Sequence, residues 1–131
     1  MAGGTSVPPM LAMRRSAQSG SKAMTAAYAA VYTDLSSSTI AYLFAGARIN
    51  LSPMQAGDII NIRVRKIVVA GGAWVLHDQL NYQNAQPANH PSVDIRGIPD
   101  VYGIEISMQQ TAGVLRTIET EFYAAKILGT S

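Results

Sequence analysis

The side chains best suited to acid–base or metal chemistry are two histidines, His77 and His90. Sites of this kind combine histidine with carboxylates. His77 stands beside Asp78, but adjacent residues on a strand point to opposite faces, so the two do not readily share one ligand. His90 lies in a proline-rich segment, where we expect a solvated or hydrogen-bonded imidazole. We therefore expect no catalytic residue and no bound metal.

Two carboxylates, Glu119 and Glu121, share one face of an expected strand and lie about 7 Å apart by strand geometry. That separation is compatible with the carboxylate pair of a glycosidase. Acids on an open strand face are more commonly solvated, and Arg116 and Lys126 are near enough in sequence to pair with them across strands. We expect a solvated, ion-paired face here and no active site.

Other motifs of catalysis and cofactor binding are missing from the sequence. It contains no cysteine, which excludes disulfides, thiolate metal sites and cysteine nucleophiles. The serines at 36–38 lack a nucleophile elbow, and there is no glycine-rich phosphate or dinucleotide fingerprint. Asp94, Arg96 and Asp100 lack the regular oxygen spacing of a calcium loop, and we expect them to form an Asp–Arg clasp. The sequence predicts neither an enzyme nor a cofactor.

Aromatic residues stand out because the sequence has only six tyrosines, two phenylalanines and one tryptophan. Tyrosine and tryptophan are enriched at protein interfaces, and their rings also stack on sugars. The alternative is that several of them seal the rim of the core. The residues that we expect to contact a ligand or a partner are Trp74, Tyr82, His90, Arg96 and Tyr102.

Alternation of apolar and polar residues with period two predicts strands along most of the chain. The clearest runs are residues 59–66 and 102–109. A change of parity near Arg65 indicates either a bulge or a segment that is buried on both faces. The glycine pair at 71–72 predicts a hairpin turn. Residues 23–35 fit a strand, with an alanine-rich helix as the alternative.

Residues 83–99 are expected to form a long connection, because Pro87, Pro91 and Pro99 forbid a regular central strand. Within it, only residues 93–95 are expected to form a short edge piece. Loops of this length commonly carry function or contacts. The six or seven expected strands, separated by turn signals, predict an all-β chain. Its fold class is an antiparallel β-sandwich or jelly-roll-like domain.

The first 24 residues differ in composition from the rest and predict an extended N-terminal arm, followed by a β-sandwich domain over residues 25–131. The arm is rich in Gly, Ser and Pro and holds three of the ten cations and none of the eight acids. We expect no strand in it, and we expect its deletion to leave the body folded. An apolar stretch precedes the cations, which is typical of a docking strap. The expected contacts with a neighbouring subunit are Val7, Pro8, Pro9, Met10, Leu11, Met13, Arg14 and Arg15.

Bulk composition limits the classes of partner. Charged residues make up only 14% of the chain, so much of its surface is uncharged, which suits permanent contacts. The body is nearly neutral and lacks a basic stripe, so nucleic-acid contact is expected only through the arm. No run reaches the roughly 18 apolar residues of a membrane-spanning helix, and no secretory signal is visible.

Two segments carry a resemblance to known proteins: LSPMQAGDIINIRV at residues 51–64 and YGIEISMQQTAGVLRTIETEFY at residues 102–123. Their sequence of strand, Gly-Asp turn, strand and closing hairpin resembles small β-sandwich virion proteins that decorate or connect capsids and tails. The resemblance implies a structural subunit of a large homo-oligomeric assembly, a viral capsid or decoration protein, located in the virion and assembled in the host cytoplasm. The implied partners are copies of itself and other virion subunits. No functional residue is carried over.

The alternative interpretation is a carbohydrate- or receptor-binding β-sandwich module. In that case Trp74 or exposed tyrosines would stack on sugars, and residues 83–99 would shape the site. The mass of the native particle separates the two interpretations, because a binding module does not require a large assembly.

Overall fold

A computed structural model describes residues 10–35, 42–100 and 102–128, with side chains over residues 15–35, 44–97 and 102–124. Within these residues the chain forms strands and turns and no helix, so none of them forms a helix that could cross a membrane. The strands are β1 (Met10–Arg15), β2 (Gly20–Ala23), β3 (Ala29–Asp34), β4 (Tyr42–Asn50), β5 (Ile59–Lys66), β6 (Val75–Gln83), β7 (Ser92–Asp100), β8 (Ile104–Ala112) and β9 (Thr117–Leu128).

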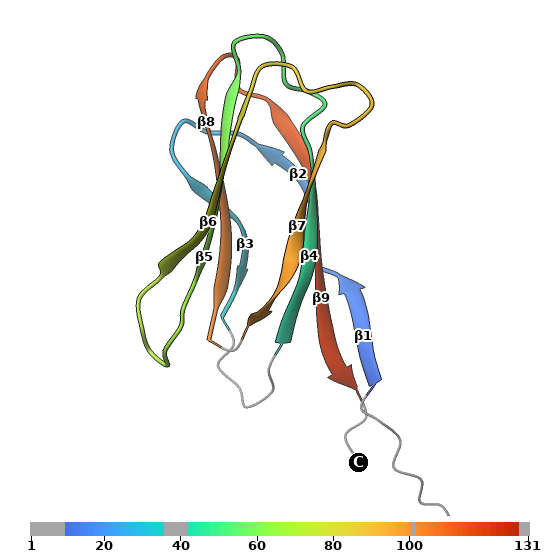
Figure 1. The fold of residues 1–131 in the computed structure, drawn as a ribbon, viewed down its shortest axis with the longest axis vertical. Helices are drawn as coiled ribbons and strands as arrows, with labels where there is room; N and C mark the ends of the chain where they lie inside the picture. Colours follow the sequence, from blue (N-terminus) through green and yellow to red (C-terminus); the bar gives the residue numbers. More distant parts are fainter. Residues whose placement is uncertain (1–9, 36–41, 101, 129–131) are drawn as a thin grey trace, which may run out of the picture.

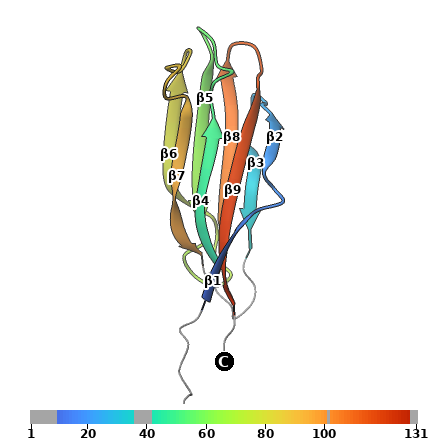
Figure 2. The same cartoon turned by 90° about the vertical axis from the view of Figure 1, so that its right-hand side faces the viewer.

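The strands form two antiparallel sheets that pack face to face (Figure 1). One sheet has the order β1-β9-β4-β7, with β2 also paired to β9, and the other has the order β3-β8-β5-β6. From β2 onward every connection crosses between the sheets except the β5–β6 hairpin. This winding is that of a double-sheet jelly roll, and it confirms the predicted all-β sandwich. The strands run along the long axis of the molecule (Figure 2).

The core lies between the two sheets and is filled by the inward face of each strand. Phe44 and Phe122 come from one sheet and meet Tyr32 of the other, with ring centroids 5.4 and 5.0 Å from that of Tyr32. Around this aromatic cluster pack fully buried aliphatic side chains, among them Ile49, Ile60, Ile62, Ile104, Ile106 and Ile118. Apolar burial of this kind is the main term that stabilises the fold.

Several sequence predictions are confirmed in the four-stranded sheet. In β5, Ile60, Ile62 and Val64 are buried while the residues between them are half-buried, as period two requires. The register of β5 against β6 shifts between Val64 and Arg65, where a bulge was predicted, but the extra residue belongs to β6, and β5 stays in regular register with β8 there. Residues 29–34 of the alanine-rich stretch form strand β3, so the helix alternative is wrong.

The N-terminal segment differs from its prediction, because residues 10–23 are strands of the sandwich. Met10 to Arg15 pair with Leu128 to Tyr123 of β9, and Gly20 to Ala23 pair with Thr120 to Thr117. β1 and β2 therefore form one interrupted edge strand. The expectation that no strand precedes residue 25 is wrong. Residues 1–22 contain most of this edge strand, so their deletion would uncover β9, and the expectation that the body folds without them loses its basis.

The segment predicted to be a long connection also contains a strand. β7 covers residues 92–100 and includes the expected edge piece at 93–95. It also includes Pro99, opposite Leu43 of β4. Proline is tolerated there because β7 is the last strand of its sheet, where one row of backbone groups has no ladder to complete.

Gln18 joins the two sheets at the side formed by β2 and β3. It lies in the turn between β1 and β2, where its side-chain amide donates to the Thr33 carbonyl at 2.8 Å and accepts from the Thr33 N–H at 2.9 Å. The amide thus pairs with Thr33 as a neighbouring strand would. Ser19 fixes the same turn from the other side, since its hydroxyl accepts from the Phe122 N–H at 2.9 Å. An edge strand that is covered in this way is protected from pairing with another chain.

A buried carboxylate, Asp58, organises the loops at the end of the sandwich shown at the top of Figure 1. It accepts from Arg116 Nε at 2.7 Å, from Arg116 Nη2 at 3.3 Å and from the Gln55 N–H at 2.8 Å. These bonds hold the pKa of Asp58 below its ordinary value, with the Arg116 hydrogen bond as the largest cause. Gly113 makes room for the carboxylate, because a Cβ at this position would lie 1.9 Å from Asp58 Oδ1.

Gln110, also buried, fixes the β8–β9 turn beside this pair. Its amide nitrogen donates to the carbonyls of Ala112 and Val114 at 3.0 and 2.7 Å, and its oxygen accepts from the Arg116 N–H at 2.9 Å. Both ends of the amide are therefore satisfied within one turn. The turn that carries Val114 is held by side chains that cannot move without leaving buried polar atoms unpaired.

We expect Asp58→Asn to lower the midpoint of chemical denaturation at pH 7, because it leaves the Arg116 guanidinium without its charged partner. The folded-state pKa of Asp58 is lowered, so its contribution is present above the ordinary aspartate pKa of about 3.9 and is lost as the pH falls through the folded value. The wild type should therefore lose more stability below pH 4 than the variant does.

Asp94→Asn is the matched control for this experiment. Asp94 also pairs with an arginine, Arg48, at 3.2 Å, but the two side chains are 68% and 63% exposed. An exposed pair contributes little, so this substitution should leave both the midpoint and its pH dependence nearly unchanged. Equal effects of the two substitutions would contradict the role given to Asp58.

Gln18→Glu tests the link between the sheets. The carboxylate keeps the length of the side chain but cannot donate to the Thr33 carbonyl, so we expect a loss of about 0.5–1.5 kcal/mol in the free energy of unfolding at pH 7. Chemical denaturation measures it, and Gln109→Glu on the outer face of β8 controls for the added charge. A midpoint equal to that of the control would show that the Gln18 amide does not join the sheets.

Candidate functional site: the cleft between β6 and β7

The residues predicted to contact a ligand or partner fall into two groups. Tyr82, His90 and Arg96 line one cleft between β6 and β7. Trp74 belongs to the connection between β5 and β6, which lies at the lower end of the sandwich in Figure 1. A Cβ at Gly103 would lie 3.3 Å from its ring. Tyr102 precedes Gly103 and is 39% exposed. The structure therefore brings three of the five predicted residues together.

The cleft lies between the edge strands of the two sheets. β6 and β7 lie on the same side of the molecule in Figure 2, and neither has a second pairing partner among the described strands. Two hollows of about 460 and 590 Å³ adjoin along it and share four lining residues. The shared residues are Tyr82, Val93, Asp94 and Arg96. Together the hollows form a groove bordered by two unpaired strand edges.

The floor of the groove is apolar. Leu80 and Tyr82 of β6 and Val93 and Ile95 of β7 are half-buried and pack against the core. They occupy alternate positions on their strands, so the same period-two pattern that builds the core also lines the groove. Such a lining with polar groups at its rim is typical of a binding cleft.

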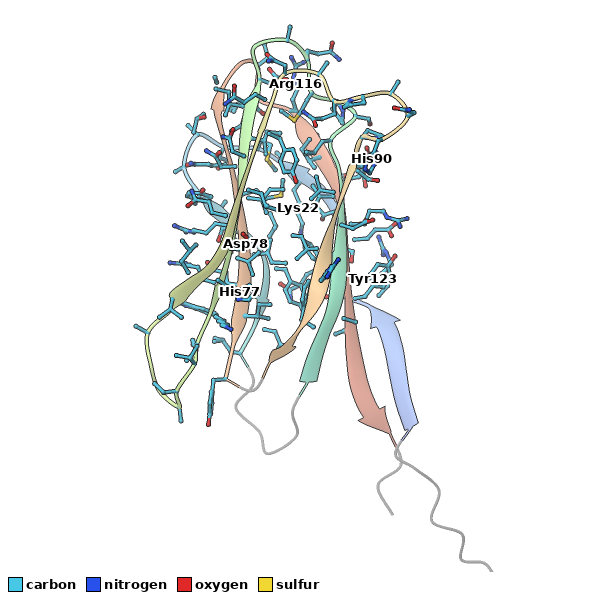
Figure 3. The ribbon with its side chains drawn as sticks, viewed as in Figure 1. Lys22, His77, Asp78, His90, Arg116 and Tyr123 are labelled. Carbon is cyan, nitrogen blue, oxygen red and sulfur yellow. The ribbon has the colours of Figure 1, made fainter. Side chains whose placement is uncertain are left out.

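A bulge in β6 changes the expected position of His77. Val64 pairs with Asp78 and Arg65 pairs with Leu76, so His77 is the extra residue of the bulge. Both His77 and Asp78 line the groove, and Figure 3 places them along β6. The prediction that the two do not readily share one ligand assumed a regular strand, and it stays a prediction.

Tyr82 carries the clearest electrostatic signature of the groove. Burial raises the pKa of its phenol, and the nearby carboxylate of Asp78 raises it further. The hydroxyl therefore stays protonated and can donate one hydrogen bond and accept others. It is suited to a neutral polar group such as a sugar hydroxyl or a peptide carbonyl.

The predicted clasp around Asp94 forms with a different partner. Asp94 pairs with Arg48 on the neighbouring strand β4, which lies directly opposite it in the register. Arg96 is exposed at the rim of the groove, and the Asp100 side chain lies outside the described residues. The prediction missed Arg48 because a sequence does not reveal which strand lies beside β7.

The two carboxylates of β9, whose face was predicted to be solvated and ion-paired, make hydrogen bonds to hydroxyl groups. Glu119 accepts from the Ser21 hydroxyl, and Glu121 accepts from the Tyr123 hydroxyl, which raises the pKa of Tyr123. Arg48 lies opposite Glu121 in the register. Arg116 pairs with Asp58 instead of these acids, contrary to the prediction, and the Lys126 side chain lies outside the described residues.

Among the described side chains, no three His, Asp or Glu residues lie close enough together to hold a metal ion. His90 is exposed in the turn before β7, where its N–H donates to the Pro87 carbonyl at 2.9 Å. Figure 3 shows it away from His77 and Asp78.

The arm residues are described only in part. Val7, Pro8 and Pro9 lie outside the described residues, and Met10, Leu11, Met13 and Arg14 are placed by their backbone in β1. Arg15 is exposed and lines a hollow of about 350 Å³ on the outer face of the sheet, together with Glu119 and Glu121. Contact of the arm with another subunit remains a prediction.

Sequence reasoning missed two groups of residues with structural consequences. Gln18, Asp58 and Gln110 act through contacts between segments far apart in the chain, and no local pattern marks them. A set of exposed apolar side chains around residues 67–76 was also missed. The signal was available, because this run of ten residues contains no charge.

No protein-family model matches this chain, and no curated protein is similar to it in sequence. Solved structures do match its fold. A protein from the structure titled "Bacillus endospore appendages form a novel family of disulfide-linked pili" has a TM-score of 0.57 and 13% identity, over 92% of this chain and 91% of the other. In fold, this chain is similar to a pilus protein and to virion proteins.

The viral matches come from infectious bursal disease virus. A chain of the Gx strain has a TM-score of 0.57 and 11% identity over 91% of this chain. VP2 of the subviral particle has a TM-score of 0.54 and 12% identity over 90% of this chain. This chain spans 32% of the length of each viral chain. At these identities the comparison establishes the jelly-roll fold, in agreement with the resemblance to β-structured virion proteins.

Proposed function

We propose that this chain is a structural subunit of a large homo-oligomeric assembly, a capsid or decoration protein of a virion. The observation that carries the proposal is the fold, which extends over nearly the whole chain and is shared with a protein of a pilus and with virus particles. Its partners would be copies of itself and other virion subunits. Nucleic acid would be reached only through the N-terminal arm.

The surface of the molecule supports this role. β6 and β7 each present one unpaired edge, and few charges cover the chain as a whole. Unpaired edges invite pairing with another chain, and an uncharged surface favours lasting contact. Since the sequence contains no cysteine, contacts between copies would rest on noncovalent packing.

The N-terminal arm is proposed to dock on a neighbouring subunit through Val7, Pro8, Pro9, Met10, Leu11, Met13, Arg14 and Arg15. The position of β1 supports this, because β1 is the outermost strand of its sheet and pairs on one side with β9. Its other side faces away from the sandwich, so a neighbour can lie against it. Arg14 and Arg15 would then meet acidic groups of that neighbour.

We expect the native protein to form particles far heavier than the 13.9 kDa chain, and sedimentation measures their mass. Deleting residues 1–9 should leave the far-UV circular dichroism unchanged, since β1 begins at Met10, but should raise the concentration needed for assembly about tenfold. Arg14→Glu with Arg15→Glu should act in the same direction.

Lys22→Glu is the control, because Lys22 is the third cation of the basic segment and lies in β2, outside the proposed contact. A monomer at every concentration would overturn the assembly proposal. Unchanged particles after both arm changes would leave assembly standing and exclude the arm from it.

The groove between β6 and β7 favours a second candidate function, a carbohydrate- or receptor-binding module. Its half-buried Tyr82, flanked by Asp78 and rimmed by Arg96 and His90, combines a ring for stacking with hydrogen-bonding groups. Both functions can belong to one virion protein.

A glycan array tests this candidate. We expect Tyr82→Ala to abolish binding of any glycan that the wild type retains, while Tyr102→Ala, at the distant end, leaves it intact. The absence of any bound glycan with the wild type would remove the candidate.

A further inference from the structure

Exposed apolar residues belong to several segments that lie at the lower end of the sandwich in Figure 1. Of the eight large apolar side chains that are exposed among the described residues, six belong to segments that meet there. The exposed fractions of the eight side chains lie between 39% and 68%, so none of the eight is buried by the fold. These six residues, which we name the end patch, are Leu35, Val68, Val69, Val75, Leu76 and Tyr102.

The strand register explains why these residues meet. The β5–β6 connection carries Val68 and Val69, and its strands bring Val75 and Leu76 opposite Lys66 and Arg65. Leu35 follows β3, whose last residue pairs with Ile104. A Cβ at Gly103 would lie 3.1 Å from Ile67, 3.2 Å from Leu35 and 3.3 Å from Trp74. The connection, the end of β3 and the start of β8 therefore form one surface.

The remaining two exposed apolar side chains lie at the opposite end. Val114 and Leu115, which we name the tip, are 68% and 56% exposed in the β8–β9 turn. β8 spans the length between the two surfaces, because Ile104 at its start pairs with Lys66 and Ala112 at its end pairs with Ile59. Each copy thus carries an apolar projection at one end and a broader apolar surface at the other.

The tip is held in a fixed shape. Gln110 binds the carbonyl of Val114, and the turn is further fixed by Gly113 against Asp58 and by the bonds of Arg116. A projection that is already ordered loses little conformational freedom when it is buried in a contact. Exposed apolar residues on such a rigid turn are suited to insertion into another surface.

The tip and the end patch carry few charges that would oppose their burial in a contact. Residues 67–76 and 111–115 contain no charged residue. At the borders, Arg116 is paired with Asp58, and Arg65 is paired with Glu105 and lies 5.8 Å from the Trp74 ring. Among the described side chains, a contact between the two ends would therefore desolvate few charges outside these pairs, namely Asp34 and Lys66 at the margin of the end patch.

We infer that copies of this chain stack head to tail, with the tip of one copy seated on the end patch of the next. The inference rests on the proposed assembly function and specifies one of its contacts. A twofold contact of end patch on end patch would leave every tip exposed, whereas head-to-tail stacking covers both surfaces. Contacts of this heterologous kind build rings or filaments.

Two double variants test the stacking. The patch variant carries Val68→Ser and Val69→Ser, the tip variant carries Val114→Ser and Leu115→Ser, and Ala29→Ser with Ala30→Ser on exposed positions of β3 is the matched control. All six side chains are exposed, so we expect each variant to fold. Sedimentation should show a growing particle mass in the wild type and in the control. It should show no such growth in either variant alone.

Mixing the two variants gives the decisive result. Each retains the surface that the other has lost, so one productive contact forms and growth stops. We expect a complex whose mass exceeds that of either variant alone by one subunit or one ring of subunits. No change in mass on mixing would overturn the inference, as would assembly of the tip variant equal to the wild type, which indicates a twofold contact.

The failure of this inference is distinguishable from that of the proposed function. A monomeric wild type overturns both, whereas wild-type particles that persist in both variants overturn the stacking alone. Binding of the wild type to lipid vesicles that is lost in the patch variant but kept in the tip variant would assign the end patch to a membrane and also overturn the stacking.

Discussion

The burial of one carboxylate, that of Asp58, constrains much of the remaining structure. With 1% of its side chain exposed, this charge is tolerable only while Arg116 and the Gln55 N–H stay in place. The Asp58 carbonyl also accepts from the Asn84 N–H, and the Arg116 carbonyl accepts from the Met24 N–H. Four connections between strands therefore meet around one charge. The two charges of this network are paired with each other, which makes a dry contact at this end feasible.

The two long sides of the sandwich differ in how the edges of the sheets are covered. On one side, the Gln18 amide covers part of the β3 edge and ties it to the opposite sheet. On the other side, β6 and β7 keep their free edges and leave a groove between the sheets. One side is tied across the two sheets and the other holds an open groove, so the two sides of the molecule differ from each other.

The sequence predicted those parts of the fold that depend on local periodicity. The alternation of Ile60, Ile62 and Val64 is a property of one strand and is independent of its neighbours. β1 escaped prediction because its stability comes from pairing with residues of β9 more than a hundred positions away. β7 was largely missed because Pro99 excludes a strand only when the strand is central, and strand order cannot be read from periodicity.

The candidate groove was predicted in composition but not in position. Tyr82, His90 and Arg96 were chosen by residue type, and the fold brings them together because β6 and β7 are both terminal strands. His77 joins them as the extra residue of a bulge in β6, whereas the sequence pattern had indicated a bulge in β5. Asp58 and Arg116 are 58 residues apart, and their pairing follows from topology alone.

The direction of the strands has a mechanical consequence. They run along the long axis in both views of the molecule, and the tip and the end patch lie at the two ends of that axis (Figures 1 and 2). Tension applied along a stack would load the ladders of hydrogen bonds in shear, so that many bonds share the force at once. A pull across the strands would open the same bonds one after another. The jelly roll is thus oriented to resist stretching in the direction in which its copies would join.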